Sequence, residues 1–203
     1  MRGWVAMVGL VMVTAPAPAQ ADWRTIVEAR LLKSVVQLSD TCSGFVINEK
    51  EDYVLTAKHC GPDDPSKPVV VDLIPGKVIA TDVHKDLLVV HVPGVDRPAL
   101  KIADSDPHYG QPVASFGYGG GYERPMLRLA TVAQPKAIIP DAGPGEWVML
   151  DAAFVGGQSG APVVNAAGEV VMMVQMSSAL MGIGRSAEVI RDRVGKYCEK
   201  AKP

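Results

Sequence analysis

The chain has 203 residues, with 20 basic and 22 acidic side chains and a formal net charge of −2. Hydrophobic residues make up 48% and charged residues 21% of it, which is typical of a folded globular protein and excludes intrinsic disorder. The absence of a basic excess argues against nucleic acid as a partner. Aromatic residues make up only 5%, whereas Val, Ala, Gly and Pro are abundant, so we expect short strands and many turns.

Residues 1–21 have the pattern of a secretory signal peptide. A basic start at Arg2 precedes an apolar run over residues 4–13, and small residues precede the expected cleavage after Ala21. The apolar run is about half of the roughly 20 residues that span a bilayer, so we expect no stable membrane anchor. The sequence therefore predicts an exported protein, either periplasmic or secreted.

Export to an oxidising compartment makes a structural disulfide possible among the three cysteines. Cys42 and Cys60 are the expected pair, and closing their loop of about 17 residues would stabilise the fold by about 3 kcal/mol. Cys198 is left over in a charged C-terminal stretch. Both a free thiol and an intermolecular link are compatible with that position.

The first half of the chain begins with a predicted helix. Residues 22–33 place Ile26, Ala29 and Lys33 at helical spacing without Gly or Pro. Short apolar segments bounded by Asp, Pro, Gly and Asn then predict strands over residues 34–38, 42–47, 53–56, 69–74, 77–81 and 87–92. So many strands within about sixty residues indicate a small closed barrel or a sandwich.

A connector rich in Pro, Asp and Ser over residues 93–107 precedes a second half of similar plan. Its expected strands cover residues 111–117, 126–133, 146–150, 161–165 and 169–174. Residues 186–200 carry a helical apolar stripe, and Ser186 is the expected N-cap. The glycine run within residues 118–122 lacks the Lys of a phosphate-binding loop and is interpreted as a surface loop.

A serine surrounded by glycines lies between two apolar stretches, in the sequence Gly156-Gly157-Gln158-Ser159-Gly160-Ala161-Pro162. Glycine lets the backbone turn sharply, so that N–H groups can point toward the position of a substrate oxyanion. A β-turn with an incidental serine fits this segment equally well.

A histidine directly follows the apolar segment Leu55-Thr56-Ala57-Lys58. A general base needs a fixed position, and the neighbouring Cys60 can provide it. The context favours a functional His59 over a purely structural one.

An acidic residue, Asp86, comes immediately before the strongly apolar residues 87–90. A partly buried carboxylate there could hold an imidazole in one tautomer and stabilise its positive charge. By itself the segment fits an ordinary strand-opening aspartate, and Asp82 is the nearest alternative for the role.

The order of these residues along the chain separates the hydrolase folds. His59, Asp86 and Ser159 follow the order of the chymotrypsin arrangement. None of the four histidines lies beyond Ser159, which excludes an α/β-hydrolase triad. A subtilisin-type order would need its aspartate before His59.

Together these segments resemble the trypsin-like serine peptidases of the chymotrypsin fold, specifically the HtrA-like bacterial branch. The resemblance covers about residues 34–178. The matching segments are residues 42–47, 55–60, 86–90, 102–106, 110–113 and 157–162. It implies an all-β fold of two six-stranded antiparallel β-barrels with short N- and C-terminal helices. Residues 22–100 would form the first barrel and residues 101–203 the second, without a PDZ domain.

The resemblance also implies the roles of particular residues in a serine endopeptidase acting on peptides or proteins. It assigns a catalytic triad of His59, Asp86 and Ser159. It supports the disulfide between Cys42 and Cys60 and gives oxyanion-hole donors at Gly157 and Ser159. The implied substrate pocket is uncharged and comprises Ala153, Gln175, Met176 and Ser177. We therefore expect cleavage after small or medium apolar residues, with no cofactor and no metal.

Two departures from the family pattern affect these expectations. Gln158 stands where zymogen-activated members have the Asp that pairs with a new N-terminus, so activation by cleavage is not expected. Ala161 replaces a glycine, which adds one methyl group but leaves the N–H donors in place.

The alternative function is a catalytically silent peptidase-fold module that binds peptides, because a fold can be kept after its catalytic activity is lost. The oligomeric state stays open.

Overall fold

The computed structural model describes residues 22–39 and 41–198. The predicted signal peptide, residues 1–21, therefore lies outside the described residues. Within the described part of the chain, no helix has the length and apolar character required to cross a membrane.

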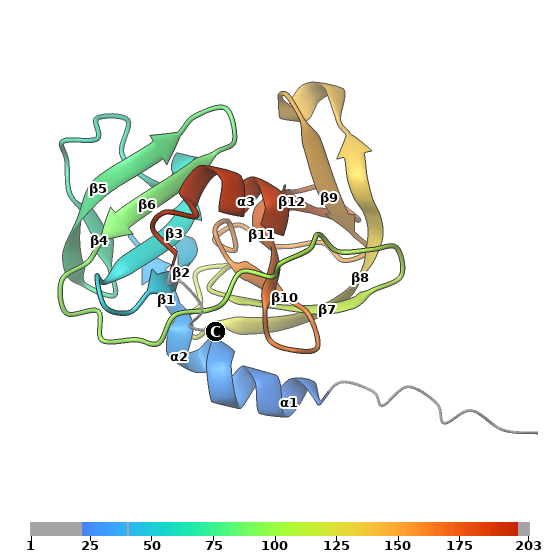
Figure 1. The fold of residues 1–203 in the computed structure, drawn as a ribbon, viewed down its shortest axis with the longest axis horizontal. Helices are drawn as coiled ribbons and strands as arrows, with labels where there is room; N and C mark the ends of the chain where they lie inside the picture. The colour runs from blue at the N-terminus through green and yellow to red at the C-terminus, as the bar shows by residue number, and fades with distance from the viewer. Residues whose placement is uncertain (1–21, 40, 199–203) are drawn as a thin grey trace, which may run out of the picture.

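Two closed antiparallel barrels make up most of the protein, side by side in Figure 1. The strands of the first barrel, in the order β1-β2-β3-β6-β5-β4, are β1 Val35–Leu38, β2 Cys42–Asn48, β3 Tyr53–Ala57, β4 Val69–Val71, β5 Ile74–Asp82 and β6 Leu87–His91. Those of the second, in the order β10-β11-β12-β9-β8-β7, are β7 Pro112–Gly117, β8 Met126–Ile138, β9 Glu146–Leu150, β10 Pro162–Val164, β11 Val170–Ser177 and β12 Gly182–Ser186. The predicted two-barrel fold is confirmed.

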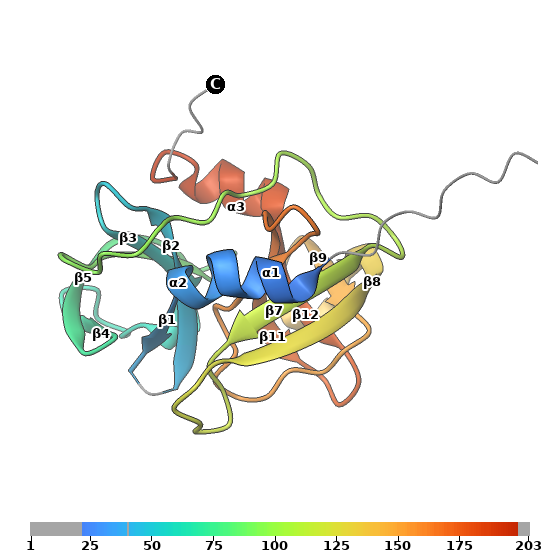
Figure 2. The same ribbon diagram turned by 90° about the horizontal axis from the view of Figure 1, so that it is seen from below.

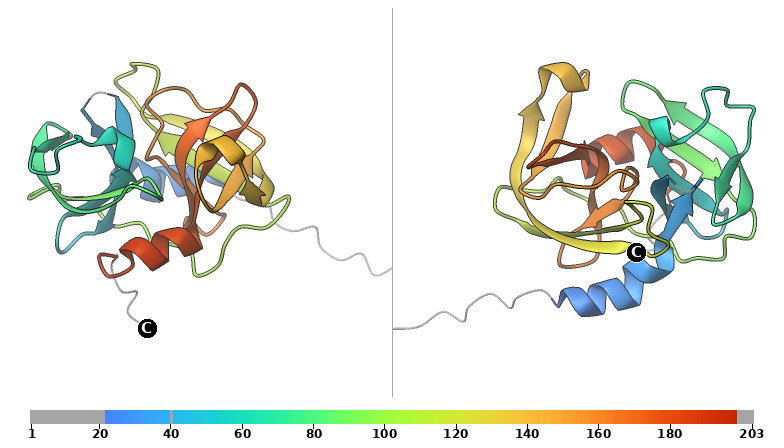
Figure 3. Two further views of the ribbon diagram at one scale, coloured as in Figure 1. Left: turned by 90° about the horizontal axis from the view of Figure 1, so that it is seen from above. Right: turned by 180° about the vertical axis from the view of Figure 1, so that it is seen from behind.

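Short helices lie along the junction of the two barrels (Figures 2 and 3). The first helical segment consists of α1 Trp23–Ile26, the π-helical turn η1 Val27–Leu31 and α2 Leu32–Ser34. Asp22 caps it by accepting a hydrogen bond from the Thr25 N–H. Near the other end, α3 Ala187–Val194 is capped by Ser186, which accepts from the Val189 N–H as expected.

One hydrophobic cluster runs through both barrels and the helices that flank them. Its fully or almost fully buried members include Leu31, Phe45, Leu55, Leu87, Val113, Leu150, Met172 and Ile190. Burying one such side chain contributes about 1.5–3 kcal/mol, so the barrels are joined by a shared core and hold the residues between them in place.

Some strand and helix boundaries differ from the sequence predictions. No strand was predicted at β12, because two glycines among its five residues weaken the β pattern. The segment predicted over residues 69–74 is interrupted at Asp72 and Leu73, whose positive φ angles of 46° and 69° make the turn between β4 and β5. The predicted helix over residues 186–200 ends at Val194, and Gly195 is its C-cap.

Candidate active site

His59 and Asp86 are brought together by the pairing of β3 with β6. His59 lies on η2 (Lys58–Cys60), just after β3, and Asp86 comes just before β6, whose Leu87 pairs with Ala57. The His59 Nδ1 lies 2.7 Å from Asp86 Oδ2, and the His59 backbone N–H donates to Asp86 Oδ1 at 2.9 Å. Two hydrogen bonds to one carboxylate therefore fix the orientation of the imidazole.

The same carboxylate controls the charge of His59. The hydrogen bond from Asp86 raises the pKa of His59 above its ordinary value, and the negative charge of Asp86 acts in the same direction. Partial burial and the ammonium of Lys58 oppose this effect. A proton taken up by His59 is thus stabilised where Asp86 holds the ring.

Ser159 lies in the loop between β9 and β10, close to the first barrel. Its carbonyl oxygen accepts a hydrogen bond from the Ser43 N–H at 2.8 Å. Gly160 has φ +83°, and a Cβ there would lie 2.0 Å from the Ser43 carbonyl oxygen, so only glycine fits next to the serine. The Ser159 hydroxyl donates to the Gln175 carbonyl at 3.2 Å, and no hydrogen bond joins it to His59 in the described structure.

The predicted disulfide between Cys42 and Cys60 is present. It joins the start of β2 to the residue after His59, and Cys60 Sγ lies 3.8 Å from the Ser159 carbonyl oxygen. Cys42, His59 and Cys60 offer ligand atoms within 4.8 Å of one another, but the disulfide leaves neither sulfur as a thiolate for a metal.

Burial raises the pKa of the Cys198 thiol to about 11.

The backbone N–H groups of Gly157 and Ser159 are oriented indirectly. Each belongs to a peptide unit whose carbonyl accepts a hydrogen bond from another residue. The Gly156 carbonyl accepts from the Gly120 N–H at 2.7 Å, and the Gln158 carbonyl accepts from the Ala161 N–H at 3.0 Å. In a trans peptide the N–H points away from the C=O, so the N–H groups of Gly157 and Ser159 face the opposite side. Within the described structure neither of them has an acceptor, which leaves both available to an oxyanion.

The glycine run that follows β7 lies at the surface as expected, since Gly120, Gly121 and Tyr122 are exposed. One of its glycines, Gly119, is buried against the loop that carries Ser159. A Cβ on Gly119 would lie 2.8 Å from side-chain carbons of Gln158 and Val155, and Gly120 supplies the hydrogen bond to Gly156. The run therefore supports the segment that carries the two free N–H groups.

A pocket of about 210 Å³ opens next to Ser159. Its other lining residues are Phe154, Val155, Gly156, Val174, Met176 and Ser177. Of the four residues predicted to line the pocket, Met176 and Ser177 do so, whereas Ala153 and Gln175 do not. Phe154 was not predicted from the sequence. Its ring packs so closely on Gly182 that a Cβ added to Gly182 would lie 2.1 Å from a ring carbon of Phe154. The pocket carries no charged side chain.

Gln175 acts away from the pocket because its side chain turns toward the first barrel. The side chain is buried, and its Nε2 donates to the carbonyls of Lys85 at 2.8 Å and Asp86 at 2.7 Å. The backbone carbonyl of the same residue accepts from Ser159. Gln175 therefore connects β11 to the turn that carries Asp86.

This combination of two antiparallel barrels with a histidine, a carboxylate and a glycine-flanked serine at their junction defines the class of trypsin-like folds. Residues 42–173 match the family described as "Trypsin-like peptidase domain". The match covers more than half of the chain, which therefore belongs to this family.

Curated relatives and solved structures agree with this assignment. The chain is 29% identical over 151 residues to a "Probable periplasmic serine endoprotease DegP-like" from Pseudomonas fluorescens, covering 70% of this chain and 31% of the relative. It is 30% identical over 135 residues to a protein of the same description from Pseudomonas fulva, covering 64% of this chain and 27% of that relative. The chain thus spans about a third of the length of these proteins.

Two solved structures share the fold. The Rv3671c protease from M. tuberculosis in its active form has a TM-score of 0.71 at 22% identity, with 98% of this chain and 96% of that chain covered. The serine endoprotease from Yersinia pestis has a TM-score of 0.72 at 18% identity, with 88% of this chain and 67% of that chain covered.

Proposed function

We propose that the protein is a serine endopeptidase in which Ser159 is the nucleophile, His59 the general base and Asp86 the residue that orients His59. The observation that carries the proposal is the pair of hydrogen bonds from His59 to Asp86. They leave the other ring nitrogen, Nε2, to exchange protons with the serine, which is the role of the histidine in a triad.

The reaction begins when the Ser159 hydroxyl turns from the Gln175 carbonyl toward His59. His59 Nε2 takes the hydroxyl proton while Oγ attacks the scissile carbonyl, and the imidazolium then gives this proton to the departing amine. Water repeats the sequence on the acyl-enzyme, releasing the second product and restoring the free serine. Asp86 stays ionised and stabilises the positive charge on His59 in both halves.

The oxyanion of each tetrahedral intermediate binds to the N–H groups of Gly157 and Ser159. Their orientation supports this role, because the bonds to Gly120 and Ala161 hold the carbonyls of the two peptide units on the other side. A preorganised donor of this kind contributes about 3 kcal/mol of transition-state stabilisation, since no reorganisation is needed when the charge develops.

The pocket beside Ser159 receives the side chain of the residue before the cleaved bond. Phe154, Val174 and Met176 make it apolar, and a lysine or arginine would find no carboxylate in it. Small or medium apolar residues are therefore the preferred substrates at this position. A peptide-library profile dominated by basic residues would contradict this preference.

The protein acts after export, with residues 1–21 removed as a signal peptide. The periplasmic description of the curated relatives supports this location, as does a disulfide beside the site, since such bonds persist in oxidising compartments. Residues 22–100 and 101–203 then form the two halves of one peptidase domain.

The test is the intact mass of the non-reduced mature chain before and after a fluorophosphonate probe, with Ser159→Ala as the matched control. We expect a single adduct on the wild-type chain, formed by Oγ displacing fluoride, and none on the variant. Cleavage of apolar peptides should disappear with the same substitution. Peptide binding without an adduct or turnover on a folded, oxidised chain would favour the catalytically silent module instead.

A further inference from the structure

The turn before β6 places Asp86 through its backbone, and side chains of the second barrel hold that backbone. The carbonyls of three successive residues, His84, Lys85 and Asp86, all accept hydrogen bonds from side chains of β11 or β12. Asp86 has φ +55°, a left-handed conformation that a non-glycine residue adopts at a cost. Such a conformation persists only when its surroundings enforce it.

Arg185 of β12 is the charged member of this arrangement and is only 1% exposed. Its guanidinium carbon lies 3.4 Å from the centre of the Trp147 ring. Nη1 donates to the Glu146 carbonyl at 3.0 Å, and Nη2 donates to the carbonyls of Pro144 at 3.2 Å and His84 at 3.4 Å. The guanidinium therefore joins the loop before β9 to the turn that carries Asp86.

Arg185 is a buried cation without a direct ion pair in the described part of the chain. Burial lowers the pKa of Arg185 to about 10, and the negative charges of Asp86 and Asp82 oppose that shift. The side chain is therefore still positive at neutral pH. Burying a charge in this way is costly, and an apolar side chain packed on Trp147 would avoid the cost, so a buried guanidinium at this position points to a role beyond packing.

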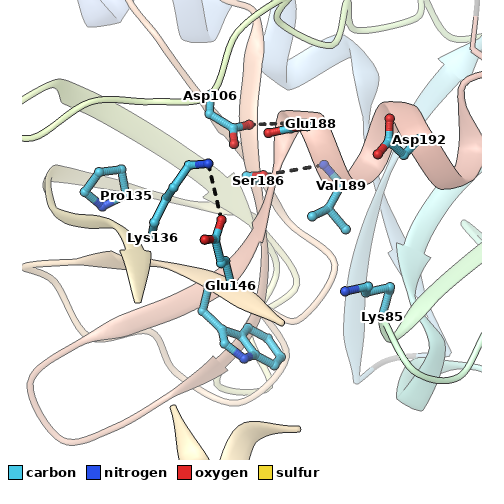
Figure 4. Close-up of a pocket in the computed structure, with 10 residues that line it drawn as sticks. Lys85, Asp106, Pro135, Lys136, Glu146, Ser186, Glu188, Val189 and Asp192 are labelled. Carbon is cyan, nitrogen blue, oxygen red and sulfur yellow. Dashed lines mark hydrogen bonds and ion pairs between the residues drawn. The ribbon is translucent and has the colours of Figure 1, made fainter. Parts of the chain in front are cut away.

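A cavity of about 220 Å³ lies beside this arrangement (Figure 4). Lys85, Glu146 and Trp147 line it, together with the start of α3. In Figure 4 the side chains of Lys85 and Glu146 lie on different sides of this hollow, and Glu146 pairs with Lys136 across 3.3 Å. Because the cavity leaves open space on this side of the turn, its hydrogen bonds to β11 and β12 contribute to holding it in place.

We propose that Arg185 is a positioning residue of the active site: by binding the His84 carbonyl it anchors the turn and so holds the Asp86 carboxylate against His59. This inference rests on the proposed function and deepens it. Arg185 touches neither the substrate nor the reacting atoms, and acts only through the turn.

The direction of the pKa change on removing Arg185 separates positioning from a purely electrostatic effect. His59 faces the Asp86 carboxylate and the Lys58 ammonium, and Asp82 and Lys85 lie on the same turn as Asp86. If the turn relaxes, the bond between Asp86 and His59 weakens and the pKa of His59 falls toward its ordinary value. If only a nearby positive charge is lost, the pKa of His59 rises.

The experiment is an NMR titration of the His59 imidazole in Ser159→Ala protein, with the signal assigned by His59→Gln. Arg185→Met and Arg185→Lys are compared, because the lysine keeps the charge but lacks the planar guanidinium, whose separated N–H groups reach both the loop before β9 and the His84 carbonyl. Arg191→Lys is the control: its guanidinium also binds a backbone carbonyl, that of Ala103 in the connector, away from this turn.

We expect the pKa of His59 to fall by about half a unit or more in both Arg185 variants and to stay unchanged in the control. An unchanged pKa in both, with only a lower melting temperature, would overturn the proposal. So would a rise in Arg185→Met with no change in Arg185→Lys. If Arg185→Met does not fold, Arg185→Lys decides alone.

The titration is independent of turnover, so it separates the two proposals. The rate of fluorophosphonate reaction is measured in parallel on chains that retain Ser159. If the wild-type chain does not react, the proposed peptidase activity fails while the titration still decides the role of Arg185. If it reacts, Arg185→Lys should lower kcat for a peptide substrate more than it changes KM, because the pocket is untouched.

Discussion

The hydroxyl of Ser159 donates to the backbone carbonyl of Gln175 at 3.2 Å, while the side-chain amide of the same Gln175 holds the turn of Asp86. One residue of β11 therefore contacts both the proposed nucleophile and the turn that places Asp86. In this arrangement the serine hydroxyl is held by a backbone acceptor, and the proposed mechanism requires its side chain to rotate toward His59.

Gln175→Leu should reduce activity without closing the substrate pocket. The substitution removes the donor to Lys85 and Asp86 and leaves the Lys85 carbonyl unpaired, which costs about 1–3 kcal/mol. We expect kcat to fall more than KM rises in hydrolysis of an apolar peptide ester. Gln37→Leu, a change at a half-buried glutamine of β1, is the control. Equal losses of kcat in both variants would contradict a specific role for Gln175.

Activity should rise with pH through a midpoint above 6.5. Asp86 raises the pKa of His59, and only the neutral imidazole accepts the serine proton. Asp86→Asn should move the midpoint down and lower kcat on the order of 10⁴-fold, as expected when the imidazole loses its orienting charge. The measurement is kcat/KM from pH 5 to 9, with a melting curve at each pH to confirm folding. A flat profile would count against His59 as the base.

The same raised pKa links His59 to stability. A group whose pKa is higher in the folded state stabilises the fold fully below its unfolded pKa, here about 6.5. This contribution is lost as the pH rises through the folded-state value. The protonated form that contributes to stability is therefore the one that cannot act as base.

The strands of the barrels and the three candidate catalytic residues could be predicted from the sequence because both depend on local patterns. Short runs of Leu and Val such as residues 87–90 predict strands, and the order of His59, Asp86 and Ser159 is distinctive enough to indicate the family. The strand β12 was not predicted, because its glycines disfavour a strand locally and the strand forms through pairing with β9 and β11.

The place of Phe154 in the pocket and the burial of Arg185 could not be predicted in this way, because tertiary contacts decide them. Phe154 lines the pocket only because Gly182, distant in the sequence, leaves room for its ring. Its position as a bulky side chain just before the glycines was the available signal. Arg185 is a charged residue in a glycine-rich segment, which normally indicates the surface. Its burial depends on Trp147 and on three carbonyls from two other segments, the start of β9 and the turn before β6.

Ser43→Ala should weaken the support of the serine loop. The buried Ser43 hydroxyl lies 2.9 Å from the Gly157 carbonyl and 3.1 Å from the Tyr118 carbonyl as possible acceptors, and it accepts from the Tyr118 N–H at 2.8 Å. Its loss leaves buried backbone groups unpaired and should lower both kcat and the free energy of unfolding, the latter by about 1–3 kcal/mol.

Ser115→Ala is the matched control for this change. Ser115 is equally buried, and its hydroxyl donates to the carbonyl of Pro162, the first residue of β10, rather than to the carbonyls of Gly157 and Tyr118. Urea unfolding and peptide hydrolysis are measured on both variants. We expect similar losses of stability but a larger loss of kcat in Ser43→Ala, and equal kcat values would refute the role of Ser43 in supporting the loop.

Removing the disulfide should destabilise the fold in proportion to the loop that it closes. Cys42 and Cys60 are 18 positions apart, so Cys42→Ala/Cys60→Ala should lose about 3 kcal/mol in urea unfolding. Cys198→Ser controls for the loss of a thiol outside the disulfide and should leave activity unchanged. A double variant as stable as the oxidised wild type would show that the bond does not restrict the unfolded chain as expected.

A carboxylate placed in the pocket should change which residue is accepted before the cleaved bond. Met176 lines the pocket, and Met176→Asp would give a lysine or arginine side chain the partner that the wild-type pocket lacks. We expect preference to move toward basic residues by roughly tenfold in kcat/KM, equivalent to about 1.4 kcal/mol. Met181→Asp adds the same charge just before β12, outside the pocket lining, and should keep the apolar preference. A shift in both variants would indicate long-range attraction of basic peptides, whereas a shift confined to Met176→Asp would identify this pocket as the site of specificity.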